Sequence, residues 1–174
     1  MKKALQGFIA FTNKVNENIG SWAAWLTTVL VVVVCGRVFG RMIFDSEPVW
    51  LPELEWHLFS LIFLLAAGYT LKHDKHVRVD LFYAKFSKKD KALVNLVGAV
   101  VFLVPWCLLI IWASYHYAMG SFKIMEGSPN PNGLPYRFII KFAITAGFGL
   151  LLLQALAMIA DSILKLNFEA EEEN

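Results

Sequence analysis

The sequence predicts an all-α integral membrane protein with four transmembrane helices. Hydrophobic residues make up 57% of the 174 residues, whereas soluble domains are about 45–50% apolar. Four long stretches contain no Asp, Glu, Lys or Arg, and each approaches or exceeds the roughly 20 residues that a helix needs to cross the hydrocarbon core. Because lipid offers no hydrogen bonds to a peptide group, these stretches are expected to be helical, including the valine-rich part of the first.

The four stretches are expected to form a single membrane domain over residues 1–174. The stretches without charge are 18–36, 56–71, 92–122 and 142–160, and we expect helices at about 18–42, 53–72, 92–120 and 141–162. Pro105 should kink the third helix, because proline has no backbone N–H to donate within it. The short acidic tail, 167–174, is expected to be solvated in the cytoplasm.

Lysine and arginine are distributed unevenly over the segments outside the helices. Eleven of the 16 basic residues lie before the first helix, in the loop at 72–91 and in the tail. Because cytoplasmic segments carry an excess of Lys and Arg, both termini and the 72–91 loop should face the cytoplasm. The loops after the first and third helices should then face the periplasm or the exterior. The net charge of only +2 gives no reason to expect a nucleic-acid partner.

The cytoplasmic loop between the second and third helices contains a segment, 77–86, that mixes apolar and charged residues. Such a segment suits a short amphipathic piece lying in the membrane interface. It could brace a partner subunit, or the basic loop could be attracted to anionic membrane lipids. The charged residues assigned to this contact are Lys75, Arg78, Asp80 and Lys85. His73 and His76 have a spacing that could ligate a metal, but no other ligands cluster with them, so no metal site is predicted.

Charged residues of both signs gather where the first helix ends and the second begins. Arg37 and Arg41 are one helical turn apart, and Glu53 and Glu55 follow Pro52 at the start of the second helix. Proline and acidic residues both suit the first turn of a helix. The arginines and glutamates could form ion pairs between the helices, or all four could face headgroups and water. In the functional interpretation they help to form an outer docking surface.

The loop between the third and fourth helices is rich in residues that form turns. Residues 126–141 read EGSPNPNGLPYRFIIK, and proline and glycine in this pattern favour tight turns. Three prolines restrict the backbone, so less conformational entropy is lost when a partner binds. The simpler interpretation is a connector, although the loop is long for that role. The residues assigned to docking here are Glu126, Ser128, Pro131 and Lys141.

Two histidines suggest an alternative function. His57 and His116 should lie at similar depth near the outer ends of the second and third helices, where they could bind one haem. The simpler interpretation is that they are two histidines at the membrane interface.

A membrane enzyme is not favoured, because no nucleophile with a paired base and no metal cluster is present. Ionisable residues do not mark an ion path inside the helices, so the chain should not conduct alone, although transport by a homo-oligomer stays open. No cofactor is predicted.

Two stretches of the chain resemble a known family. Residues 55–80 read EWHLFSLIFLLAAGYTLKHDKHVRVD, and the second stretch is the 126–141 loop quoted above. In this order and on these sides of the membrane, they resemble the small, DctQ-like membrane subunit of tripartite ATP-independent periplasmic (TRAP) transporters. The resemblance covers nearly the whole chain, because the number of spans, the length and the predicted cytoplasmic ends also agree.

The resemblance implies a non-catalytic scaffold in the bacterial inner membrane. In this family a large, DctM-like membrane subunit carries the substrate and sodium ions by an elevator-type motion. A periplasmic, DctP-like binding protein delivers the substrate, usually an organic acid anion. The small subunit would brace the large one and offer periplasmic surface to the binding protein. Which organic acid is carried is not indicated by the sequence.

Overall fold

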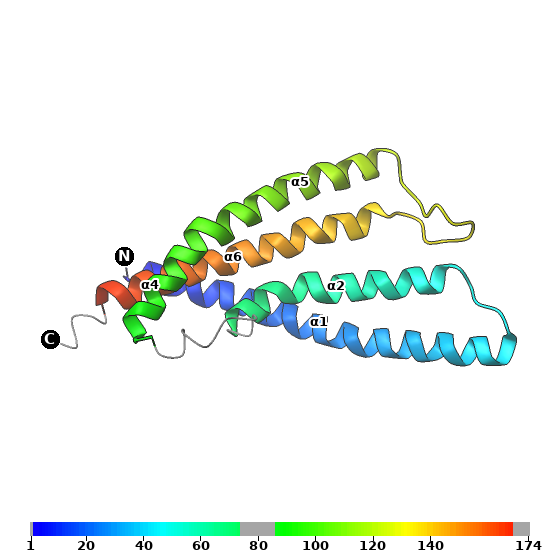
Figure 1. Ribbon diagram of the computed structural model, residues 1–174, viewed down its shortest axis with the longest axis horizontal. Helices are drawn as coiled ribbons and strands as arrows, with labels where there is room; N and C mark the ends of the chain where they lie inside the picture. Colours follow the sequence, from blue (N-terminus) through cyan, green and yellow to red (C-terminus); the bar gives the residue numbers. More distant parts are fainter. Residues whose placement is uncertain (1, 74–85, 169–174) are drawn as a thin grey trace.

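Helices account for nearly all of the chain that the structure describes. The computed structural model describes residues 2–73 and 86–168, and Figure 1 shows them as a bundle of long helices. The elements are α1 (Lys2–Phe44), α2 (Trp50–Lys72), α4 (Lys88–Gly98), a π-helical turn η1 (Ala99–Leu103), α5 (Val104–Lys123) and α6 (Phe138–Phe168). No strand occurs within these residues, in agreement with the predicted all-α class.

Four helical segments are long and apolar enough to cross a membrane, which agrees with the four predicted spans. They are Lys2–Phe44, Trp50–Lys72, Lys89–Lys123 and Phe138–Asn167. The start of α1 and the end of α6 lie at the same end of the bundle (Figure 1), which we call the terminal end. The opposite end carries the connections at 45–49 and 124–137, and we call it the loop end.

The last helix, α6, is the centre of the bundle. It packs against α1, α2, α4 and α5, whereas α5 packs against α6 and the adjoining η1 turn. The buried apolar residues of α6 are mostly small, among them Ala143, Ala155, Ala157 and Ala160. Small side chains let helix backbones approach closely, which is how helices associate where lipid removes the usual hydrophobic driving force. α6 therefore holds the other helices together.

A cluster of buried amides joins α1 to α6 in the terminal half of the bundle. Asn16 donates from Nδ2 to Oε1 of Gln154 at 2.9 Å, and Gln154 donates from Nε2 to Oδ1 of Asn13 at 3.0 Å. Thr12 and Asn16 are fully buried. α1 begins at Lys2, well before the expected start near residue 18. The hydrogen bonds to Gln154 hold this added part of the helix against α6.

The expected break near Pro105 takes the form of the π-helical turn Ala99–Leu103. Pro105 lies at the start of α5 and cannot donate a backbone hydrogen bond to the preceding turn. A wider turn shifts the hydrogen-bonding register locally, and such turns are known causes of helix bending. The path from α4 into α5 changes direction in this region (Figure 1).

Candidate functional site

The side chain of Glu53, in the first turn of α2, anchors the 124–137 loop. It is 5% exposed. Its Oε1 accepts hydrogen bonds from the hydroxyl of Ser128 and from Nδ2 of Asn130, the latter at 3.0 Å. Its Oε2 accepts from the backbone N–H of Leu134 at 2.7 Å. Three donors from one loop thus converge on one carboxylate, and hydrogen bonds to a charged acceptor are stronger than neutral ones.

A tight turn at the tip of this loop presents Pro131 to solvent. Gly133 donates its backbone N–H to the carbonyl of Asn130 at 3.1 Å, and Asn132 has a φ of 62°. Proline at the second position and Asn with positive φ at the third are the pattern of a type II turn. Gly133 follows, and a Cβ there would collide with Ser128 and approach the Glu53 carboxylate. The turn thus depends on Pro131, Asn132 and Gly133, and Gly133 also leaves room for the Glu53 carboxylate that anchors the loop.

A second group of charges joins the end of α1 to the start of α2. Arg37 donates from Nε to Glu55 at 2.6 Å and from Nη1 to Glu47 at 3.0 Å. Nη1 of Arg41 lies 4.0 Å from Glu47, and the Arg41 side chain is 72% exposed. Of the two interpretations of these charges, the ion pair between the helices is thus confirmed for Arg37 with Glu55. Arg37 therefore joins the end of α1 to the 45–49 connection and to the start of α2, whereas the Arg41 side chain points toward solvent.

A third contact joins the 124–137 loop to α6. Nζ of Lys141 lies 2.5 Å from Oε2 of Glu126 and 4.0 Å from the centre of the Tyr117 ring. The guanidinium of Arg137 lies 5.7 Å from the centre of the Trp56 ring. These residues border a cavity of about 380 Å³ between α2, α5 and α6. Aromatic rings and cations at the mouth of an apolar cavity suit a membrane interface.

The Lys141–Glu126 pair gives the loop end a pH dependence. The Lys141 ammonium holds the pKa of the Glu126 carboxyl below its ordinary value of 4.5. A lowered pKa stabilises the fold at neutral pH, and this contribution is lost as the pH falls through the lowered value. We expect Glu126→Gln to destabilise the protein at pH 7 and to match the wild type in acid. Thermal unfolding of both proteins, measured from pH 7 into acid, gives the difference in stability between Glu126→Gln and the wild type. This difference would not change with pH if the ion pair contributed nothing.

The structure brings most of the predicted docking residues together at the loop end, with different exposures. Arg41 and Pro131 are exposed, Arg37 and Glu55 are paired, and Glu53 is buried under the loop. Glu126, Ser128 and Lys141 are partly buried and bonded to neighbouring side chains. Asn130 and the Leu134 backbone, which also bind Glu53, were not predicted. The Asn-Pro-Asn-Gly pattern was the available signal for this turn.

The two histidines of the haem alternative lie on helices that do not pack closely together. His57 is on α2 and His116 on α5, and α6 contacts both helices. Nδ1 of His57 lies 2.5 Å from the Glu53 carbonyl, and Nδ1 of His116 lies 2.8 Å from the Trp112 carbonyl. Within residues 2–73 and 86–168, no group of three or more His, Cys, Asp or Glu side chains could hold a metal. The structure gives the haem alternative no support.

The predicted cytoplasmic contact falls mostly outside the part of the chain that the structure describes. Lys75, Arg78, Asp80, Lys85 and the possible metal ligand His76 all lie there, as does most of the 77–86 segment. His73 is described, and its Nε2 lies 3.0 Å from a carboxylate oxygen of Glu17, to which Lys72 also donates. This contact between α1 and α2 at the terminal end was not predicted.

Comparison with known protein families gives one match. Residues 30–165 match the family described as tripartite ATP-independent periplasmic transporters, DctQ component. The chain belongs to the DctQ family. The resemblance seen in the sequence is thereby confirmed, and the protein is a small membrane component of a TRAP transporter. No curated protein matches the chain.

The DctQ match includes the whole loop end but only part of α1. Glu53, the 124–137 loop and the cationic residues Arg37, Arg41 and Lys141 all lie within it. The first half of α1, with Asn13 and Asn16 of the amide cluster, precedes it. A DctQ protein with four candidate membrane spans is a multi-pass protein of the inner membrane.

Proposed function

We propose that this DctQ protein is a fixed, non-catalytic scaffold for the large DctM-like carrier subunit. It also docks the periplasmic DctP-like binding protein during sodium-coupled uptake of an organic acid anion. The single observation that carries this proposal is that the spans contain no acidic or basic residue through their middles, in a chain that belongs to a transporter family. Ion paths in transporters are normally marked by such residues. The partner must therefore supply the path.

Apolar surface along two helices supports the scaffold role. Large exposed apolar side chains of α1 are concentrated from Trp22 to Phe44, and those of α5 include Trp106 and Trp112. α5 is covered by α6 on one side, so its remaining faces are available to lipid or to a large membrane partner. A rigid helix with such faces can brace a moving neighbour.

The loop end supports the docking role. Its 124–137 loop is held by the Glu53 carboxylate and by the Lys141–Glu126 pair, so its shape is fixed before a partner arrives. Less conformational entropy is then lost on binding. The positive-inside distribution of Lys and Arg supports a periplasmic position for this end, with both termini in the cytoplasm.

Arg41 gives the cleanest test of docking. The Arg41 side chain is 72% exposed and comes no closer than 4.0 Å to Glu47, its ion-pair partner. Arg41→Glu should therefore leave the fold intact. We expect the affinity of the purified membrane complex for its binding protein to fall about fivefold, and more at low salt, since exposed charges act over a Debye length.

The same reversal at Arg37 or Lys141 should also weaken docking, but it would break an ion pair within the chain as well. Lys2→Glu, near the start of α1 at the other end of the molecule, is the matched control. Binding measured by surface plasmon resonance checks the expectation. Unchanged affinity in Arg41→Glu, Arg37→Glu and Lys141→Glu alike would contradict the docking role.

A further inference from the structure

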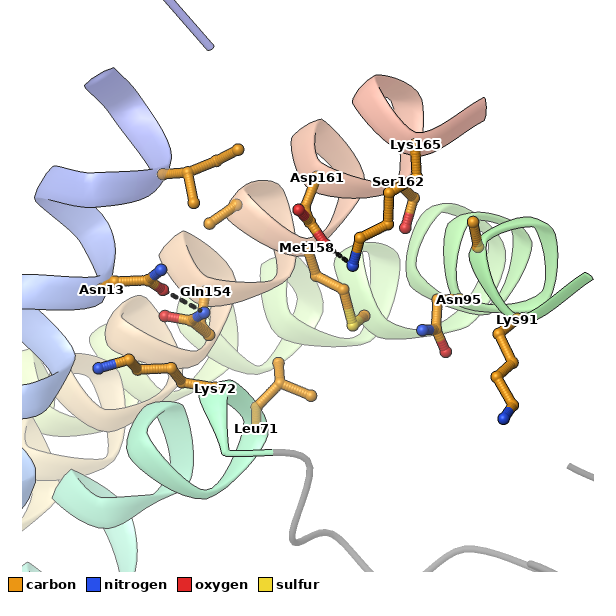
Figure 2. Close-up of a pocket in the computed structure, with 13 residues that line it drawn as sticks. Asn13, Leu71, Lys72, Lys91, Asn95, Gln154, Met158, Asp161, Ser162 and Lys165 are labelled. Atoms are coloured by element: carbon orange, nitrogen blue, oxygen red, sulfur yellow. Dashed lines mark hydrogen bonds and ion pairs between the residues drawn. The ribbon is translucent and has the colours of Figure 1, made fainter. Parts of the chain in front are cut away.

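A second cavity, of about 670 Å³, lies at the terminal end between α1, α2, α4 and α6. It is far from the loop-end residues discussed above, and nothing in the proposed function uses it. Figure 2 shows Lys72 and Leu71 from α2, Lys91 and Asn95 from α4, and a row of residues from α6 around it. Its volume is within the range of sites that hold small molecules.

The lining of this cavity is basic and rich in hydrogen-bonding groups. Three lysines, Lys72, Lys91 and Lys165, come from three different helices, against one acidic residue, Asp161. Lys165 pairs with Asp161 at 2.6 Å, and Lys72 donates to Glu17 on α1. An ammonium has three N–H donors, so one carboxylate does not use the whole capacity of Lys72.

Neutral polar groups and apolar groups divide the rest of the lining. The side chains of Asn13, Asn95, Gln154 and Ser162 contribute amides and a hydroxyl, and Asn13 and Gln154 are held in place by their mutual hydrogen bond (Figure 2). The apolar lining residues are Ile9, Leu71, Ala92, Ala157 and Met158. A ligand that fits both parts must carry an anionic, hydrogen-bonding group joined to an apolar one.

The position of the cavity narrows the class of ligand. Lys72 is the last residue of α2, and Lys91 and Lys165 lie near the start of α4 and the end of α6. Each of the three lies at or just beyond the end of a charge-free stretch, 56–71, 92–122 or 142–160, where a membrane-spanning helix is expected to reach the lipid headgroups. Basic pockets between transmembrane helices at this depth are suited to anionic lipid headgroups. We propose that this cavity binds the phosphate headgroup of an anionic phospholipid, with the glycerol and upper acyl chain along its apolar wall.

Binding of soluble lipid to the full-length protein in neutral detergent tests this proposal. The probes are dioctanoyl phosphatidylglycerol, dioctanoyl phosphatidylcholine and inorganic phosphate, and native mass spectrometry counts the bound molecules. We expect phosphatidylglycerol to bind at least tenfold more tightly than phosphatidylcholine. Lys91→Gln and Lys165→Gln should each weaken binding about fivefold, as expected for one basic residue near a membrane surface.

Lys123→Gln is the matched control, because Lys123 is an exposed lysine at the end of α5, at the loop end. It should leave lipid binding unchanged. Competition by millimolar inorganic phosphate would support the phosphate contact, whereas equally tight binding of phosphate alone would assign the cavity to a free anion and overturn the lipid. The proposal would also be overturned if phosphatidylcholine bound as tightly as phosphatidylglycerol, or if Lys123→Gln weakened binding as much as the two cavity variants. It would be overturned as well if binding of the carrier subunit displaced the lipid. The last result would identify the cavity as a protein interface.

Discussion

In a Glu53→Gln variant, the 124–137 loop should lose its fixed shape, and docking of the binding protein should weaken at least tenfold. Glutamine has nearly the same size as glutamate but carries one acceptor oxygen and an N–H₂ group that would face the donors. Ser128, Asn130 and the Leu134 N–H would then compete for that oxygen. Each charge-assisted bond contributes about 1.5–3 kcal/mol, and a buried donor left without an acceptor costs a similar amount.

Limited proteolysis measures the loop directly, because trypsin can cut after Lys123 and Arg137 at its two ends. Cleavage of Glu53→Gln should be at least tenfold faster than cleavage of the wild type. Asp45→Asn is the control, since Asp45 is an exposed acidic residue at the same end. If Glu53→Gln were as resistant as the wild type, the carboxylate would not be the anchor. If it were cleaved faster yet docked normally, the loop would not be part of the docking surface.

In a Gly147→Ala variant, α2 should be pushed away from α6, and the protein should lose roughly 3 kcal/mol of stability, at the upper end of overpacking effects. A Cβ at Gly147 would lie 2.7 Å from the carbonyl oxygen of Leu64 and 2.9 Å from its Cβ. Backbone atoms of a packed helix cannot move aside as the tip of a flexible side chain can. The helices must therefore separate, and the contact between α2 and α6 would be lost along this part of the bundle.

Gly149→Ala provides a matched control two residues further along the same helix. Nothing lies within 4 Å of a Cβ at Gly149, and alanine favours a helix over glycine by about 1 kcal/mol. Thermal unfolding in detergent should therefore show a clear decrease in midpoint for Gly147→Ala and none for Gly149→Ala. Equal decreases in the two variants would mean that glycine is needed for reasons other than the approach of α2.

The membrane spans could be predicted because their signal is local. A run of apolar residues without charge is visible in any window of the sequence, and lipid leaves such a run one structural choice. The first half of α1 was harder, because Lys2, Lys3, Lys14 and Glu17 interrupt the apolar pattern. This part of α1 is held against α6 by hydrogen bonds of Asn13 and Asn16 to Gln154. Gln154 lies 141 and 138 residues away from them in the sequence, so no local pattern indicates these contacts.

The loop end shows where prediction from sequence stops. The prolines and glycines of 126–141 identify a turn-rich loop, but they do not show what holds it. Glu53 was expected to face a partner or the helix dipole, whereas the structure places it under the loop, bonded to groups 75 to 81 residues away. Arg37 and Glu55 are only 18 residues apart, yet the sequence left two interpretations open, an ion pair between the helices or side chains that face headgroups and water, and the structure shows the ion pair.

Uptake into proteoliposomes shows whether this chain can transport a solute without the large membrane subunit. Vesicles would contain this chain alone, this chain with the large membrane subunit, or the large subunit alone, each with the loaded binding protein outside and an inward sodium gradient. We expect uptake of the binding protein's ligand only when both membrane subunits are present. Sodium-driven uptake by vesicles that contain this chain as their single membrane protein would contradict it.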